Sequence, residues 1–194
     1  ISPLVAQATI AVEDARFRDH GGVSWRSVAR GLAQTVTHLR FVSGASTLTM
    51  QVVRLVHPHH RSLAGKLGEM VDALRLERAA DKDTILEQYL NRAPYGADTI
   101  GVEAASRRYF GKPSAHLSLA EAALIAGLPQ APSRLEPLDR PDRARARQRI
   151  VLDRMVRAGM IDATARDRAL AEPLRFVAKP PPPRAMHFTE WVLA

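Results

Sequence analysis

Two adjacent carboxylates, Glu13 and Asp14, end an apolar run near the start of the chain, and His20, Gly21 and Gly22 follow within the same short segment. A carboxylate at the end of an apolar helix face is partly removed from water, which suits it to accept a proton near neutral pH. Glu13 is therefore predicted to be a general base. The competing interpretation is that both acids are solvated charges at a helix end and that the glycines only end the helix.

A second group of charged residues lies further along the chain, at Arg54, Arg61, Lys66 and Glu69. Three cations at this spacing would concentrate positive charge around an anionic leaving group. Glu69 follows Lys66 by three residues and so shares its helix face; it could hold a divalent cation or keep the lysine in place. The alternative is a surface ion pair between Lys66 and Glu69, which would contribute at most about 0.5 kcal/mol.

The stretch 43–51 separates these groups and is rich in neutral polar residues, including Ser46, Thr47 and Gln51. Gly44 would allow the backbone to approach a ligand closely, while the hydroxyls and the amide could bind sugar or phosphate oxygens. A turn capped by Ser or Thr at the start of a helix is the other interpretation.

The segment His57-Pro58-His59-His60 invites a metal interpretation. The proline breaks helical spacing, however, and no carboxylate lies beside the imidazoles in the sequence to orient them. The sequence therefore does not predict a metal site here.

Most of the elements that position these candidate residues are predicted to be helices. Aromatic residues make up only 5% of the chain and runs of β-branched residues are few, so the fold class is predicted to be mainly α. Predicted helix starts include Ser62, Asp81, Ser118 with Glu121 as a capping box, and Asp162. Pro141 is predicted to open an Arg-rich helix, and the prolines at 129, 132 and 137 are predicted to make the preceding stretch extended.

Gly65 and Gly68 lie inside the helix predicted after Ser62. Each glycine should weaken that helix by up to ~1 kcal/mol relative to alanine, unless another part of the chain packs closely against the helix backbone there.

A basic amphipathic helix is predicted from Ser24 to about Arg40. Its apolar stripe and the aromatic residue that follows it are Trp25, Val28, Leu32, Val36, Leu39 and Phe41. Arginines on the opposite face could meet anionic headgroups while the tryptophan lies at the membrane interface. The alternative is an ordinary surface helix packed on its own core.

Composition sets the remaining limits. The chain has 194 residues, a net charge of +8 and no cysteine, so it can form one domain with a substantial core and has no disulfide or thiolate site. The charge calls for a polyanionic partner: nucleic acid, anionic lipid or a phosphate-bearing substrate. No run of 18 apolar residues occurs. A start without Met and the polyproline stretch 180–183 suggest a piece of a longer protein, with a domain over 1–172 and a linker over 173–194.

Five stretches, taken together and in order, closely resemble the peptidoglycan glycosyltransferases of family 51, the polymerising domain of class A penicillin-binding proteins. They are Glu13-Asp14 with Phe17, His20 and Gly22; residues 44–51; Lys66 with Glu69; Ile85 to Asn91; and residues 120–132. Met50 and Asn91-Arg92-Ala93-Pro94 resemble the penicillin-binding protein 1C branch. Gly65 departs from the family pattern, which usually has an Arg before the Lys, and this removes one expected phosphate contact.

The resemblance implies a lysozyme-like helical domain with a small membrane-dipping jaw, acting at the periplasmic face of a bacterial inner membrane. It implies Glu13 and Glu69 as catalytic residues and a Mg²⁺ or Mn²⁺ ion associated with Glu69. Implied substrate-binding residues are Asp14, His20, Ser46, Thr47, Gln51, Arg54, Arg61 and Lys66. Lipid II, the growing glycan strand and the membrane surface would be the partners, with other cell-wall synthesis proteins possible and nucleic acid not expected.

Three alternatives stand beside this prediction. A lysozyme-like hydrolase would also use a single Glu, as a proton donor to the leaving sugar oxygen, but has no use for pyrophosphate-binding cations. A helical nucleic-acid-binding module would explain the positive charge and the Arg-rich helix after Pro141. A catalytically silent scaffold for cell-wall proteins is the third.

Overall fold

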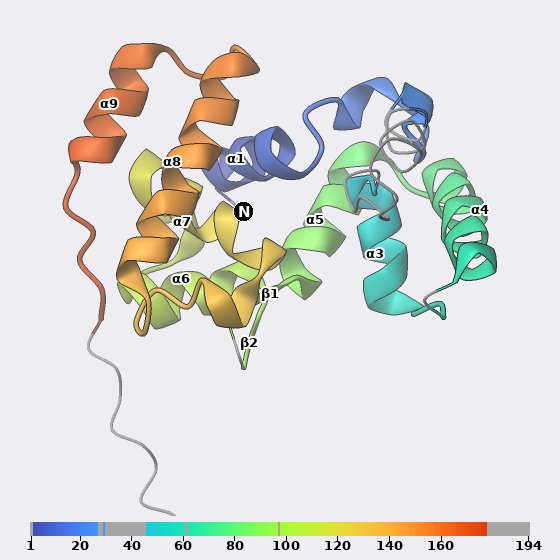
Figure 1. Ribbon diagram of the computed structural model, residues 1–194, viewed down its shortest axis with the longest axis horizontal. Coiled ribbons are helices and arrows are strands. Elements are labelled where there is room, and N and C mark those ends of the chain that lie inside the picture. Colours follow the sequence, from blue (N-terminus) through green and yellow to red (C-terminus); the bar gives the residue numbers. More distant parts are fainter. Residues whose placement is uncertain (1, 27–28, 30–45, 61, 97, 178–194) are drawn as a thin grey trace, which may run out of the picture.

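The computed structural model describes residues 2–26, 29, 46–60, 62–96 and 98–177 (Figure 1). The described elements are α1 (Pro3–Glu13), the 3-10 turn η1 (Phe17–Asp19), α3 (Leu48–Val56), α4 (Leu63–Ala79), α5 (Lys82–Arg92), β1 (Pro94–Gly96), β2 (Thr99–Ile100), α6 (Val102–Phe110), η2 (Ser114–His116), α7 (Leu119–Gly127), η3 (Leu128–Gln130), η4 (Pro132–Arg134), α8 (Pro141–Arg157) and α9 (Ala163–Ala171). The strands β1 and β2 form one antiparallel pair. The prediction of a mainly α fold is confirmed.

The predicted helix starts are also confirmed. Ser62, Asp81 and Asp162 each accept a hydrogen bond from the backbone N–H three residues later. Ser118 and Glu121 form the full capping box of α7. Each cap satisfies an N–H that the helix itself leaves unpaired, which is typically worth about 1 kcal/mol.

The proline-rich stretch before α8 was predicted to be extended, and this prediction is wrong. Residues 128–130 and 132–134 form the 3-10 turns η3 and η4. In each turn the proline occupies one of the first two positions, where its fixed φ near −65° suits a helical turn and its missing N–H leaves no bond unmade.

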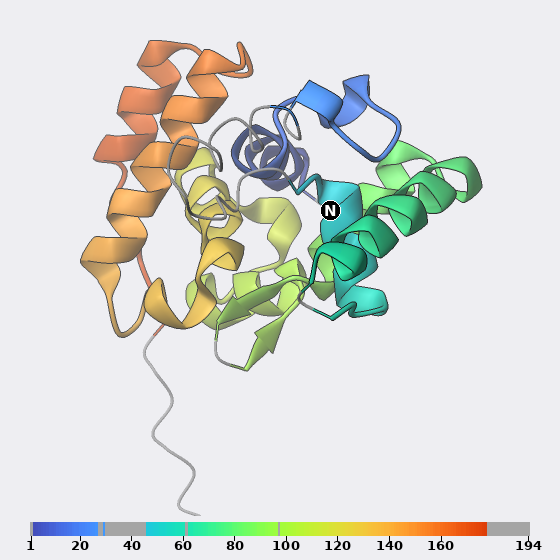
Figure 2. The same ribbon diagram turned by 45° about the vertical axis from the view of Figure 1, so that its right-hand side comes forward.

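Two groups of helices flank α5 (Figures 1 and 2). On one side, α1, α7 and α8 pack closely through small residues such as Ala8, Ala120 and Ala123. On the other side, α3 packs against both α4 and α5. The buried face of α5, with Ile85 and Tyr89, belongs to the large core. The last residue of α1, Glu13, contacts both groups, through Arg147 of α8 and Gln51 of α3.

Packing continues past α9. The rings of Phe176 and Phe110 are stacked with centroids 5.5 Å apart, and Val177 donates its backbone N–H to the carbonyl oxygen of Tyr109 at 2.9 Å. The predicted division at residue 172 stays a prediction, and the polyproline stretch lies outside the described residues. No helix in the described part of the chain combines the length and the apolar character needed to cross a bilayer.

Candidate active site

Glu13 is the last residue of α1, and its carboxylate is contacted from two sides. Gln51 of α3 donates its side-chain N–H to Oε2 at 3.0 Å. Arg147 of α8 places Nη2 4.0 Å from Oε1. The Glu13 side chain is only 14% exposed, so it is partly removed from water, as the sequence predicted, yet it retains an opening to solvent.

Arg147 is a buried residue that the sequence did not single out. Its Nε donates to the carbonyl oxygen of Gly127 at 3.3 Å, and a Cβ at that glycine would lie 2.8 Å from the Arg147 Cγ. Burial lowers the pKa of Arg147, and the nearby Glu13 carboxylate opposes this effect. Arg147 is one of several arginines along α8, and only its burial distinguishes it.

Two buried tyrosines lie near the same carboxylate. Within the described residues, the hydroxyls of Tyr89 and Tyr95 have no hydrogen-bond partner. Burial, and to a smaller extent the charge of Glu13, raises the pKa of both hydroxyls. Both tyrosines therefore stay neutral around Glu13.

Asp14 contacts the start of α3. Its Oδ2 accepts the backbone N–H of Leu48 at 3.1 Å and lies 3.0 Å from Nε2 of His20. An acceptor at the first turn of a helix pairs an unsatisfied N–H and complements the helix dipole. These contacts suit Asp14 and His20 to positioning α3.

Thr47 is fully engaged within the protein. Its hydroxyl accepts the N–H of Met50 and donates to the carbonyl oxygen of Gly22 at 2.6 Å. Thr47 is the N-cap of α3, so the capped-turn interpretation holds at this residue. Gly22 has φ +92°, and a Cβ there would lie 2.7 Å from the carbonyl oxygen of Ala73 in α4.

Side chains on one face of α3 contact both Glu13 and the charged cluster of Arg54, Lys66 and Glu69. Thr47, Gln51 and Arg54 follow one another at i, i+4 and i+7 and therefore share a face. Gln51 reaches Glu13 at 3.0 Å, and Arg54 reaches Glu69 of α4 through two hydrogen bonds of 2.8 and 2.9 Å. We refer to the side chains of Glu13, Ser46, Gln51, Arg54, Lys66 and Glu69 as the polar track.

Lys66 and Ser46 complete the distal end of the polar track. Lys66 Nζ donates to Ser46 Oγ at 2.7 Å and to Glu69 Oε2 at 3.1 Å, and Arg54 Nη2 donates to Ser46 Oγ at 3.2 Å. The Arg54 and Lys66 side chains are 48% and 36% exposed, whereas the carboxylate beneath them is 8% exposed. A buried anion thus holds two cations at the surface, which excludes the simple surface ion pair.

Glu69 and Arg54, at this end of the polar track, hold each other in their charged forms. Burial alone would raise the pKa of Glu69, but hydrogen bonds from Arg54 and Lys66 outweigh it, so the pKa is lowered. The hydrogen bond to Glu69 likewise raises the pKa of Arg54 against the effect of burial. With two cations and one carboxylate, the cluster carries a net charge of +1 and suits an anionic group.

The donor set at Glu69 does not fit a resident divalent metal. Both carboxylate oxygens already accept hydrogen bonds from cations. A Mg²⁺ or Mn²⁺ ion bound there would meet the positive charges of Arg54 and Lys66 at close range. Arg54 and Lys66 therefore supply the positive charge at this carboxylate.

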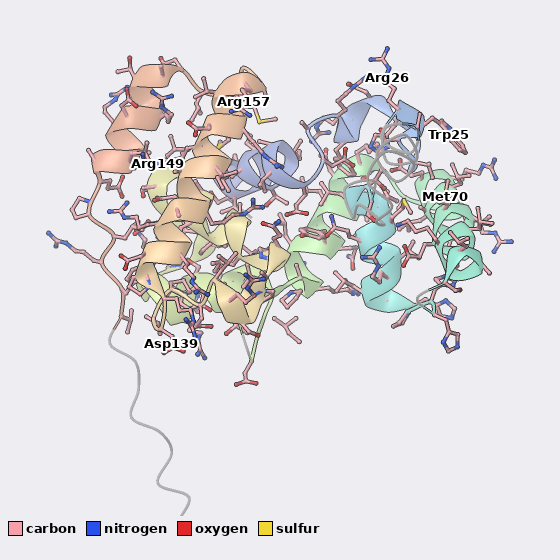
Figure 3. All side chains as sticks on the ribbon, viewed as in Figure 1. Trp25, Arg26, Met70, Asp139, Arg149 and Arg157 are labelled. Atoms are coloured by element: carbon pink, nitrogen blue, oxygen red, sulfur yellow. The ribbon has the colours of Figure 1, made fainter. Side chains whose placement is uncertain are left out.

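The structure tests only part of the remaining site prediction. Arg61 and the apolar residues Val28, Leu32, Val36, Leu39 and Phe41 lie outside the described residues. Trp25 is described, is 65% exposed and projects outward beside Arg26 (Figure 3).

An apolar surface that the sequence did not single out continues along α4. Leu63, Leu67 and Val71 lie at i, i+4 and i+8 and are all exposed, as are Leu55 and Val56 at the end of α3. The opposite side of α4, with Ala73, faces the core. Apolar residues on both sides hide the amphipathic period of this helix, so no single stripe stands out in its sequence.

The histidine segment differs from its prediction. His59 Nε2 lies 3.1 Å from Oδ2 of Asp72, a carboxylate of α4 that is thirteen positions away in the sequence. The sequence offers no carboxylate beside these imidazoles, but the fold supplies one, because α4 turns back along the segment that precedes it.

Comparison with known proteins identifies the family of this chain. Residues 1–156 match the family model described as Transglycosylase. Penicillin-binding protein 1C of Escherichia coli (strain K12) is 44% identical over 193 residues, covering 100% of this chain and 25% of that protein. A putative transglycosylase of Cupriavidus necator is 44% identical over 170 residues, covering 87% of this chain and 73% of that protein.

A solved structure supports the fold. The crystal structure of penicillin-binding protein 1A from Haemophilus influenzae is 41% identical and has a TM-score of 0.53, covering 59% of this chain and 17% of that chain. This chain spans 20–26% of the length of the first penicillin-binding relatives. The match over most of its residues confirms the resemblance: the chain belongs to the transglycosylase family found in class A penicillin-binding proteins, with a mainly helical, lysozyme-like fold.

Proposed function

We propose that this domain polymerises lipid II into peptidoglycan glycan strands. The polar track carries the proposal, because one face of α3 joins a partly buried carboxylate to a pair of exposed cations. Such an arrangement suits a reaction in which a hydroxyl loses a proton at one end and a phosphate leaves at the other.

In the proposed reaction, Glu13 accepts the proton of the free hydroxyl on the terminal sugar of lipid II. The oxygen attacks the anomeric carbon of the growing strand, a new carbon–oxygen bond forms with inversion, and the bond to undecaprenyl pyrophosphate breaks. Positioned base catalysis of this kind supplies about 10²- to 10⁴-fold in rate. Gln51 holds the carboxylate that accepts the proton.

Negative charge grows on the departing pyrophosphate. Arg54 and Lys66 would stabilise this charge, with Ser46 Oγ accepting a hydrogen bond from each of the two cations. Preorganised cations act at the transition state without further reorganisation. Arg61, Asp14, His20 and Thr47 remain proposed site residues, the last three through their hold on α3. The Mg²⁺ or Mn²⁺ ion expected at Glu69 has no part in this proposal, because both oxygens of that carboxylate accept hydrogen bonds from cations.

A lipid-borne substrate calls for a site near a membrane surface. Exposed Trp25 and the outer face of α4 with Leu63, Leu67 and Val71 could lie against the bilayer interface. We propose that the domain works at the periplasmic face of the inner membrane, in a longer protein and beside other cell-wall synthesis proteins.

The rival hydrolase is less well supported. Cleavage of a glycosidic bond by water releases a sugar hydroxyl and needs no paired cations at the leaving group. The family match also favours transfer over hydrolysis. Nucleic-acid binding and a silent scaffold have no specific contact in their favour among the described residues.

Incubation with lipid II tests the proposal. Wild type should lengthen glycan, and Glu13→Gln should lower turnover at least about 100-fold while the domain stays folded. Asp167→Asn, at an exposed carboxylate of α9, is the matched control and should polymerise normally. Solubilised fragments without polymer would support the hydrolase, and near-normal turnover of Glu13→Gln would remove that residue from its role.

A Lys66 variant separates catalysis from folding. Lys66→Ala should lose most turnover while its free energy of unfolding changes by no more than about 1 kcal/mol, because Glu69 retains Arg54. A collapse of the melting temperature would make Lys66 structural.

A further inference from the structure

We propose that His57, His59 and Asp72 form a binding site for a transition-metal cation of the Zn²⁺ class, separate from the polar track. One ligand atom from each of these residues lies within 4.8 Å of the other two. The two imidazoles come from the segment that follows α3, and the carboxylate comes from the middle of α4. The site would thus join two elements that are distant in sequence.

The spacing matches the requirements of a small cation. Ligands about 2.0–2.1 Å from a tetrahedral zinc are separated from one another by about 3.3 Å. His59 Nε2 and Asp72 Oδ2 are already 3.1 Å apart. The His57 ring meets the His59 ring edge to face with centroids 5.3 Å apart, and since His57 is exposed, rotation of its side chain can bring a ring nitrogen closer.

The Asp72 carboxylate is oriented to bind a cation beside His59. Asp72 Oδ1 accepts a hydrogen bond from Arg75 Nη1 at 3.0 Å, which leaves Oδ2 directed at His59. A ligating carboxylate is normally fixed in this way by a partner outside the metal.

Glycines in α4 make room for the histidine segment. A Cβ at Gly68 would lie 3.0 Å from both Cε1 and Nδ1 of the His59 ring, and a Cβ at Gly65 would lie 2.0 Å from the carbonyl oxygen of His60. The helix accepts two glycines at a cost of about 1 kcal/mol each. Close packing of this segment explains both, so the position of His59 is built into α4.

The ligand set selects the class of cation. Two imidazoles and one carboxylate suit Zn²⁺, Ni²⁺ or Cu²⁺, whereas Mg²⁺ prefers oxygen ligands. A fourth position would remain for water. Asp72 is paired with one permanent cation, Arg75, whereas Glu69 is paired with two, Arg54 and Lys66. His57 is exposed, and the ion would act as a clamp between 57–59 and α4.

Titration with ZnCl₂ alone, followed by calorimetry, tests the site in the full chain. Wild type should bind one equivalent, and His57→Ala, His59→Ala and Asp72→Asn should each weaken binding at least tenfold. Zn²⁺ should also raise the melting temperature of wild type but not of these variants, since only the folded state assembles the ligands. His57→Ala removes an exposed side chain, so its fold should survive.

Two other histidines provide matched controls. His60→Ala, in the same segment but outside the cluster, and His116→Ala, in η2, should bind as wild type does. Gly68→Ala should weaken binding by displacing the His59 ring. The proposal is wrong if the three ligand variants bind Zn²⁺ as tightly as wild type, if wild type binds none, or if His60→Ala abolishes binding.

Discussion

Gln51 donates its side-chain amide to the carboxylate of Glu13 at 3.0 Å, and one turn further along α3 Arg54 binds Glu69. A single helix therefore positions the proposed base and the proposed phosphate-binding cations relative to each other. Because Asp14 also accepts the backbone N–H of Leu48, the first residue of α3, the chain around Glu13 is tied to the same helix twice.

Gln51→Leu should reduce kcat by up to about 100-fold, because loss of the hydrogen bond lets the Glu13 carboxylate leave its reactive position. If Gln51 acts through Glu13, KM should change little. Steady-state kinetics with lipid II would separate the two constants, with Gln7→Leu, an exposed glutamine of α1, as control. A rise in KM with unchanged kcat would show instead that Gln51 binds substrate.

The pair formed by Arg147 and Glu13 should couple in folding. The guanidinium is buried and lies 4.0 Å from the carboxylate. A double-mutant cycle with Glu13→Gln and Arg147→Met, followed by urea denaturation, should give a coupling free energy of about 1 kcal/mol. Additive effects of the two substitutions would mean that Gly127 and the surrounding packing, not Glu13, hold the arginine.

Helix starts were readable from the sequence because a cap and its helix are neighbours in the chain. Ser62, Asp81 and Ser118 act within three residues, and their side-chain chemistry alone identifies them. Glu13 is far from Lys66 and Glu69 in the sequence, so no local pattern indicates that they lie near one another. The family resemblance, not periodicity, placed these three residues in one site.

The residues that the sequence missed are those whose role depends on burial or on contacts across the fold. Arg147 looks like the other arginines of α8 until the fold buries it against Gly127. Asp72 approaches His59 only because α4 runs back along the preceding segment. The departure at Gly65, which suggested a lost phosphate contact, has a packing cause in the carbonyl of His60.

Substitution by alanine should change stability differently at two neighbouring glycines, Gly21 and Gly22. Gly22 has φ +92° and no room for a Cβ against Ala73, whereas a Cβ at Gly21 would meet nothing within 4 Å. Gly22→Ala should lower the free energy of unfolding by about 1–3 kcal/mol, and Gly21→Ala should change it by less than about 0.5 kcal/mol. Equal melting temperatures for the two variants would contradict the close approach of this loop to α4.

The ionised state of Glu69 should stabilise the fold in a pH-dependent way. Burial acts to raise its pKa, but the hydrogen bonds of Arg54 and Lys66 lower it below the usual value of about 4.3. The stabilisation is therefore complete above that value and is lost as the pH falls through the lowered pKa of the folded state. The difference in unfolding free energy between wild type and Glu69→Gln should be largest near neutral pH.

Denaturation of both proteins between about pH 6 and pH 3 measures this difference. Other carboxylates with lowered pKa values, including Asp81 and Glu103, are common to both proteins and cancel. A difference that stays constant over the whole range would mean that Glu69 contributes through packing and not through its charge.

The outer face of α4 should contact lipid. Leu67 is 62% exposed between Leu63 and Val71, so Leu67→Glu places a charge in the middle of an apolar surface without disturbing the core. Inserting a carboxylate into the interface opposes both burial of apolar area and attraction to anionic headgroups. Sedimentation with vesicles of phosphatidylglycerol and phosphatidylethanolamine should show several-fold weaker binding of Leu67→Glu.

Ile100→Glu is the matched control, since Ile100 in β2 is 67% exposed and belongs to a different element. It adds the same charge to the chain, so a purely electrostatic effect would weaken vesicle binding equally in both variants. Loss confined to Leu67→Glu, with melting temperatures unchanged in both, would assign the contact to α4. Equal binding of Leu67→Glu and wild type would place the lipid contact elsewhere on the chain.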